Sequence, residues 1–227
     1  MNYFNSQIIL IFYFFLTSGF SQDLISFHNS GNFQLIQKLS FYDTNIKGTP
    51  FAYENFVTGQ ILFESGKSII GDFRMDLYAH KIQTKNNDGK IFEIGIDNTF
   101  DLVIDNKTYS FHELGWIEKN NYVILRECLI LENISLYEFT NKDLKKPIEA
   151  SSSTANSGYG KTADPEWIDK SDYIIYLNKK YYKVPKNHKK MIALKLFDEK
   201  TYTKFRKENK INLKNEEDLK KLITFFN

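Results

Sequence analysis

The stretch Ile-Ile-Gly-Asp-Phe-Arg-Met-Asp-Leu, residues 69–77, decides the fold. Large apolar side chains occupy alternate positions in it, and charged side chains stand between them. Because successive side chains of a strand point to opposite faces, this alternation predicts an antiparallel strand with one packed and one solvated face. The apolar set is Ile69, Phe73, Met75 and Leu77, and the charged set is Asp72, Arg74 and Asp76.

The same alternation recurs on both sides of this stretch, in residues 92–96, 100–104 and 109–111. Short turns rich in Gly, Asn and Asp separate the runs, and these residues tolerate the positive φ that tight hairpins require. The pattern predicts a meander over residues 50–140. Residues 122–139 are more continuously apolar, which predicts strands buried on both faces. The turns are Ser65–Lys67, Asp88–Lys90, Asp105–Lys107 and Asn178–Lys180.

Towards the C-terminus the apolar period changes from two to about 3.6 residues. Asn215 is a good N-cap for a last helix with an i, i+3, i+4, i+7 apolar stripe, and two shorter helices are expected over 187–197 and 199–209. The sequence predicts an α+β fold, a mostly meandering antiparallel sheet, curved or barrel-like, with short C-terminal helices packed on it. The stripe is Leu219, Leu222, Ile223 and Phe226.

The N-terminus has the pattern of a signal peptide. Ile8–Leu16 is an unbroken apolar run of nine residues, too short to span a bilayer. Gly19 and Ser21 then offer small residues before a cut at Gln22. We predict a signal peptide over 1–21 and an exported mature chain, periplasmic or extracellular, without a membrane span.

Composition divides the mature chain into three parts. A β-rich body is expected over 22–149. Residues 150–164 are rich in Ser, Gly and Ala and predict a mobile loop. Residues 165–227 should add a hairpin and the helices to the same domain. The chain contains one cysteine, Cys128, so no internal disulfide can form; its apolar neighbours predict a small buried strand residue, not a nucleophile.

Two stretches look like catalytic motifs and fail on spacing. Gly160–Thr162 resembles the end of a phosphate-binding loop, but the first glycine of that pattern is replaced by Ala155. His112–Glu113 begins a zinc-protease pattern whose second histidine is replaced by Trp116. The sequence therefore predicts no catalytic, cofactor-binding or metal-binding residue.

Two pairs of carboxylates, Asp97 with Asp101 and Asp72 with Asp76, have the residue types for acid–base chemistry. The solvated faces of strands in any acidic sheet carry such residues, so the preferred interpretation is a wet face. An exported hydrolase that uses carboxylates which the sequence does not single out stays open as an alternative.

Charge is unevenly distributed. Residues 178–227 carry 15 Lys and Arg against 6 Asp and Glu, a balance of +9, and residues 22–177 balance at −7. Lys200, Lys204 and Lys207 share one predicted helical face. The preferred interpretation pairs them with the acidic body, and the alternative is contact with an anionic lipid or glycan. Nucleic acid is not expected as a partner outside the cytoplasm.

Two sets of structural motifs resemble a family of uncharacterised exported proteins of Bacteroidetes and flavobacteria. That family has no established activity, so the resemblance implies no site residues. It favours a non-catalytic cell-envelope binding or scaffold module, for which an envelope protein is a further expected partner. A carrier that encloses an apolar ligand in a curved sheet is the remaining alternative. The motifs are Gly48–Phe51, Glu54–Val57, Gly59, Leu62–Phe63 and Gly66–Lys67, then Lys207–Ile211, Asn215–Leu219 and Phe225–Asn227.

Overall fold

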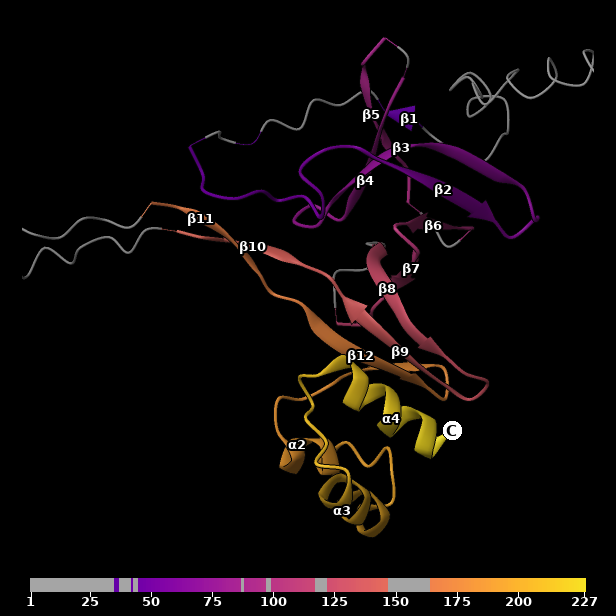
Figure 1. The fold of residues 1–227 in the computed structure, drawn as a ribbon, viewed down its shortest axis with the longest axis vertical. Helices are drawn as coiled ribbons and strands as arrows, with labels where there is room; N and C mark the ends of the chain where they lie inside the picture. The colour runs from indigo at the N-terminus through magenta and orange to yellow at the C-terminus, as the bar shows by residue number, and fades with distance from the viewer. Residues whose placement is uncertain are drawn as a thin grey trace, which may run out of the picture.

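A large antiparallel sheet and three helices make up the described part of the chain (Figure 1). The structure is a computed structural model and describes residues 35–36, 42, 45–86, 88–96, 99–116, 122–146 and 164–227. The predicted signal peptide, residues 1–21, and most of the predicted loop, residues 150–163, lie outside these ranges. The α+β class is confirmed.

The large sheet has eleven strands and open edges. In spatial order they are β1 (Leu35–Ile36), β5 (Ile91–Ile94), β4 (Lys81–Lys85), β3 (Ser68–Asp76), β2 (Val57–Phe63), β6 (Phe100–Ile104), β7 (Lys107–Glu113), β8 (Tyr122–Ile130), β9 (Ile134–Phe139), β12 (Asp172–Leu177) and β13 (Lys180–Lys183). Among the described residues β1 does not pair with β13, so the barrel-like form of the prediction is wrong.

The predicted meander is interrupted once. Strands β2 to β5 step outward in sequence order, and β6 then returns to pair with the free edge of β2. Gly59 of β2 permits this return, because a Cβ atom there would lie 2.6 Å from Ile104 Cγ1. A second, two-stranded sheet is inserted between β9 and β12. It pairs β10 (Lys142–Lys145) with β11 (Glu166–Asp169).

The predicted turns are confirmed by their backbone angles. Gly66 and Gly89 have φ of 80° and 77°. The two-residue turns Asp105–Asn106 and Asn178–Lys179 have positive φ at both positions, as the turns that match strand twist require. These turns fix the register of the strands that they join.

Apolar side chains form three clusters. The first lies on the β2–β7 part of the sheet and contains Ile61, Phe73 and Phe111. The second lies between the other half of the sheet and the helices. The third contains Tyr137 and Ile174, which neighbour Leu136 and Ile175 of the second cluster and therefore point to the opposite face. Both faces are buried at Val123–Leu125 and Ile134–Tyr137, as predicted, whereas Ile130 at the end of β8 is exposed.

Asp76 is a correction to the predicted strand pattern. It was expected on the solvated face, yet it is fully buried. Its Oδ1 accepts hydrogen bonds from the backbone N–H groups of Tyr78 and Ala79 at 3.1 and 2.9 Å, and the Tyr42 hydroxyl donates to Oδ2. The carboxylate is buried because it caps the turn that follows β3.

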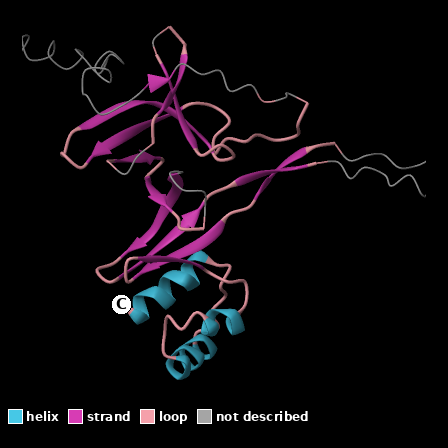
Figure 2. Cartoon of the chain, turned by 180° about the vertical axis from the view of Figure 1, so that it is seen from behind, coloured by secondary structure: helices cyan, strands magenta, loops and turns pink. Residues whose placement is uncertain are grey.

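Three helices cover one face of the sheet at its β8–β9–β12 end (Figure 2). They are α2 (His188–Ala193), α3 (Glu199–Glu208) and α4 (Glu216–Phe226). In Figure 1, α4 lies nearest the strands and α3 lies farthest from them. No helix in the described ranges is both long and apolar enough to cross a bilayer.

Candidate functional site

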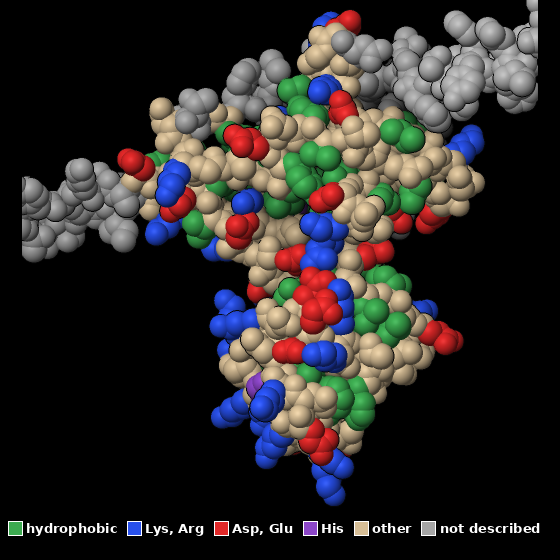
Figure 3. All heavy atoms as spheres, viewed as in Figure 1, with side chains coloured by type: hydrophobic (Ala, Val, Ile, Leu, Met, Phe, Trp, Pro, Cys, Tyr) green, Lys and Arg blue, Asp and Glu red, His purple; other side chains and the backbone are tan. Residues whose placement is uncertain are grey.

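The predicted basic face lies on α3, at the end of the molecule farthest from β1. Asp198 caps this helix, and its side chain accepts a hydrogen bond from the Thr201 backbone N–H at 2.9 Å. Tyr202 anchors the inner side of the helix and is buried against the helical cluster. Lys200, Lys204 and Lys207 are all exposed on the outer side. Figure 3 shows Lys and Arg side chains gathered over this end of the molecule.

The expected pairing of these three lysines with the acidic body is not found in the described ranges. There, no ion pair joins Lys200, Lys204 or Lys207 to an acidic side chain. Within the part of the chain that the structure describes, the one ion pair between a basic residue after position 177 and an acidic residue before it joins Lys183 to Asp172 at 2.6 Å. The pairing fails because α3 is separated from the sheet by α4.

A groove with a volume of about 370 Å³ runs between α3 and the end of α4. Its α3 wall carries two lysines and a glutamate beside the Phe205 ring, and Phe225 of α4 forms the other wall. The Phe225 ring stacks on Phe205 with the ring centroids 4.1 Å apart, yet Phe225 is 51% exposed. The groove thus offers positive charge and apolar surface together. Its lining is Lys200, Thr201, Lys204, Phe205, Glu208 and Phe225.

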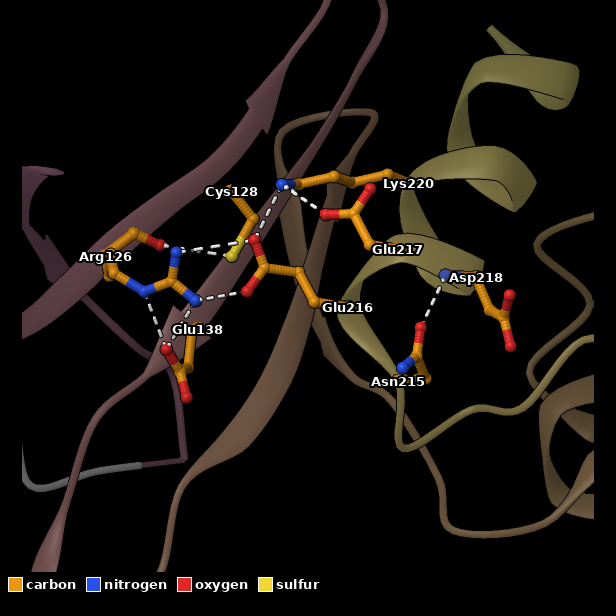
Figure 4. Close-up of polar contacts among 8 residues, drawn as sticks. All are labelled: Arg126, Cys128, Glu138, Asn215, Glu216, Glu217, Asp218 and Lys220. Atoms are coloured by element: carbon orange, nitrogen blue, oxygen red, sulfur yellow. Dashed lines mark hydrogen bonds and ion pairs between the residues drawn. The ribbon is translucent and has the colours of Figure 1, made fainter. Parts of the chain in front are cut away.

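The position of α4 fixes one wall of this groove, and a charge network fixes α4 (Figure 4). Arg126 of β8 donates to Glu138 of β9 at 2.7 Å and to Glu216, the first residue of α4, at 2.5 Å. The hydrogen bond from Arg126 lowers the pKa of Glu216. The carboxylate also lies at the positive end of the helix dipole, and the Asn215 side chain caps the same turn. The Arg126 guanidinium thereby joins β8 and β9 to the first turn of α4.

Arg126→Ala is expected to lower the free energy of unfolding by about 2–3 kcal/mol. It leaves Glu138 and Glu216 facing each other with most of their surface covered. This loss is smaller than the roughly 3–5 kcal/mol expected when a fully buried pair is broken, since these side chains are still 15–23% exposed. Urea unfolding at pH 7 measures it. Adding Glu138→Gln and Glu216→Gln to Arg126→Ala should recover most of the loss, and no recovery would contradict the charge network.

The carboxylate pairs considered from the sequence are not brought together as sites. Asp72 accepts a hydrogen bond from the Thr58 hydroxyl and pairs with Lys85 at 3.4 Å, while Asp76 is the buried turn cap. Asp97 lies outside the described residues. Asp101 instead interacts with Glu127 of β8, and burial raises the pKa of both carboxyl groups. No group of His, Cys, Asp and Glu in the described ranges has the geometry to hold a metal ion.

His112 belongs to a hydrogen-bonded row on the face opposite the helices. Its Nε2 lies 2.9 Å from Ser110 Oγ, and its Nδ1 lies 2.7 Å from the Tyr181 hydroxyl. Burial lowers the pKa of His112 to about 4, so the ring is neutral at pH 7. Cys128 packs against the helical cluster, and burial raises the pKa of its thiol to about 12. A thiol this weakly acidic is a poor nucleophile at neutral pH.

Phe225 and the groove were missed from the sequence. The apolar stripe of α4 predicted Leu219, Leu222, Ile223 and Phe226 as core; the first three are buried and Phe226 is half-buried. Phe225 lies outside that stripe. The signal in the sequence was an aromatic residue beside the stripe, in the last turn of the helix. Comparison of the chain with known protein families, with curated protein sequences and with solved structures found no match.

Proposed function

We propose that the chain is an exported cell-envelope protein that works as a non-catalytic binding module. In this proposal the outer face of α3 contacts a polyanionic component of the envelope. The observation that carries it is the set of three exposed lysines, Lys200, Lys204 and Lys207, without ion-pair partners in the described ranges. The surrounding segment, residues 178–227, has a balance of +9.

Charge alone gives this contact limited strength. A lysine near an anionic surface contributes about 1 kcal/mol, so three lysines contribute about 3 kcal/mol, or a factor of about 100 in affinity. The attraction is screened over about 10 Å at 0.1 M salt. Weak, salt-sensitive binding is therefore the expected signature.

Binding of long-chain polyphosphate to the mature protein, measured by calorimetry, tests the proposal. The triple variant Lys200→Gln, Lys204→Gln and Lys207→Gln should bind about 100-fold more weakly. The matched control replaces three exposed lysines of sheet turns by glutamine and changes the net charge equally, but should bind almost as the wild type does. Equal weakening in both variants would show that net charge, not this face, controls binding. The control lysines are Lys67, Lys90 and Lys107.

The proposed export can be tested separately from binding. The apolar run Ile8–Leu16 and the small residues at 19 and 21 predict that the mature protein begins at Gln22. Intact-mass analysis of the protein recovered from the medium or periplasm should show loss of residues 1–21. Recovery of the full-length chain from the cytoplasm would contradict export and with it the envelope setting.

The two alternative functions have less support. A carrier of an apolar ligand needs a sheet that encloses a cavity, and the described strands form an open sheet. For a hydrolase, Asp101 and Glu127 are two carboxyl groups that interact with each other, and no group of His, Cys, Asp and Glu in the described ranges has the geometry to hold a metal ion.

A further inference from the structure

Phe225 is the most exposed of the large apolar side chains in the described ranges, at 51%. It shares the α3–α4 groove with Lys200 and Lys204, and its ring is held by stacking on Phe205. A polyanion in solution would use the lysines and leave this ring in water. Charge alone therefore gives this ring no role in binding.

A second apolar side chain stands at the same end of the molecule. Ile130, at the end of β8, is 50% exposed. The β8–β9 turn that follows it touches the end of α4, since the Asn133 backbone N–H donates to Asn227 Oδ1 at 3.2 Å. Exposed apolar groups thus lie on two elements that meet beside the basic helix.

An anionic lipid bilayer is the partner that satisfies both kinds of surface. Its headgroups complement lysines, and its hydrocarbon boundary accepts an aromatic ring a few ångströms deeper. Lysine side chains can lie along the apolar boundary while their ammonium groups stay among the headgroups. We propose that the polyanionic component is the surface of an anionic bilayer and that Phe225 enters it. This inference rests on the proposed function.

Loss of the lysine charges and loss of ring insertion are expected to change vesicle binding differently. Full burial of a Phe side chain contributes enough to change an affinity by one to two powers of ten, and a half-exposed ring has about half of that free energy left to gain. Phe225→Ala should therefore weaken vesicle binding about 5- to 10-fold, with little change in its salt dependence. The triple Lys→Gln variant should weaken binding more and flatten the salt dependence.

The experiment is cosedimentation of the mature protein with vesicles of phosphatidylglycerol and phosphatidylcholine, at 50 and 150 mM salt, with pure phosphatidylcholine as the neutral control. Polyphosphate binding by the same variants runs beside it. We expect Phe225→Ala to lose vesicle affinity and keep polyphosphate affinity. Phe225→Trp should be quenched by lipids brominated on the acyl chain, beyond the quenching of the wild-type tryptophans.

The outcomes separate the two proposals. Polyphosphate binding with vesicle binding that is equal in wild type and Phe225→Ala, or without quenching of Phe225→Trp, overturns the insertion and leaves the proposed function standing. Binding to neither vesicles nor polyphosphate overturns both. A melting temperature of Phe225→Ala within a few degrees of the wild type shows that the variant is folded, and Phe225→Leu, which keeps an apolar side chain, should retain most of the vesicle affinity.

Discussion

Acidification from pH 7 to pH 4.5 is expected to lower the free energy of unfolding by about 4 kcal/mol. Burial lowers the pKa of His80 and of His112 to about 4. His80 stacks on Phe139, and its Nδ1 has no hydrogen-bond partner in the described ranges. Each ring therefore stays neutral in the folded state at pH values where a free histidine, with a pKa of about 6.5, takes up a proton.

The two histidines therefore destabilise the folded state as the pH falls. Above about pH 6.5 neither state is protonated at these rings, and their contribution to stability is fully present. As the pH falls towards 4, the unfolded chain gains protons that the folded chain does not, so stability is lost at up to about 1.4 kcal/mol per pH unit for each histidine. The raised pKa of Asp101 and Glu127 opposes part of this loss.

Urea unfolding at pH 7, 6, 5 and 4.5 measures the effect. His80→Gln and His112→Gln each replace an ionisable ring by a neutral amide, and the double variant should lose most of the pH dependence in this window; His188, whose pKa burial also lowers, accounts for part of the remainder. The measurements stop at pH 4.5 because Glu216, whose pKa is lowered, contributes to the loss of stability mainly at lower pH. A double variant with the pH profile of the wild type would contradict the assignment.

Leu222→Ala is expected to lower the free energy of unfolding by about 2–5 kcal/mol. The side chain is fully buried between α4 and the sheet, in the cluster with Leu136 and Ile175. Its loss removes apolar burial and leaves a cavity that two rigid elements cannot close. Thermal and urea unfolding measure the change. Thr224→Ala, exposed on the same helix, is the control and should stay within about 0.5 kcal/mol. An unchanged Leu222→Ala would mean that α4 does not belong to the core.

Local chemistry made most of the fold predictable. The period-2 alternation, the positive-φ turns and the capped helix after Asn215 each depend on a few neighbouring residues, and each is confirmed. The return of β6 to β2 depends on a close approach at Gly59, which looks like any other glycine in a strand. Strands β10 and β11 have few apolar residues, and 20 residues lie between them, so neither alternation nor a turn marked the pair.

Only the lysines of the candidate site could be predicted from the sequence. The spacing of Lys200, Lys204 and Lys207 placed them on one helical face, which α3 confirms. Whether they pair with the acidic body depends on where α4 lies. Its apolar stripe packs on the sheet, and the ion pair of Arg126 with Glu216, 90 positions apart, joins its first turn to β8. A long-range ion pair of this kind leaves no local pattern, and the exposed Phe225 follows from the same placement.

The late position of the helices has a consequence for biogenesis. Strands β8 and β9 are complete by residue 139, but the helix that covers their apolar face begins at residue 216. A chain that emerges from the ribosome N-terminus first therefore exposes Ile134 and Leu136 without their helical cover until more than 70 further residues have been added. Uncovered strands of this kind are prone to aggregate. We expect the newly made chain to depend on holding chaperones until α4 has been added, and a chain cut before residue 216 to accumulate as inclusion bodies.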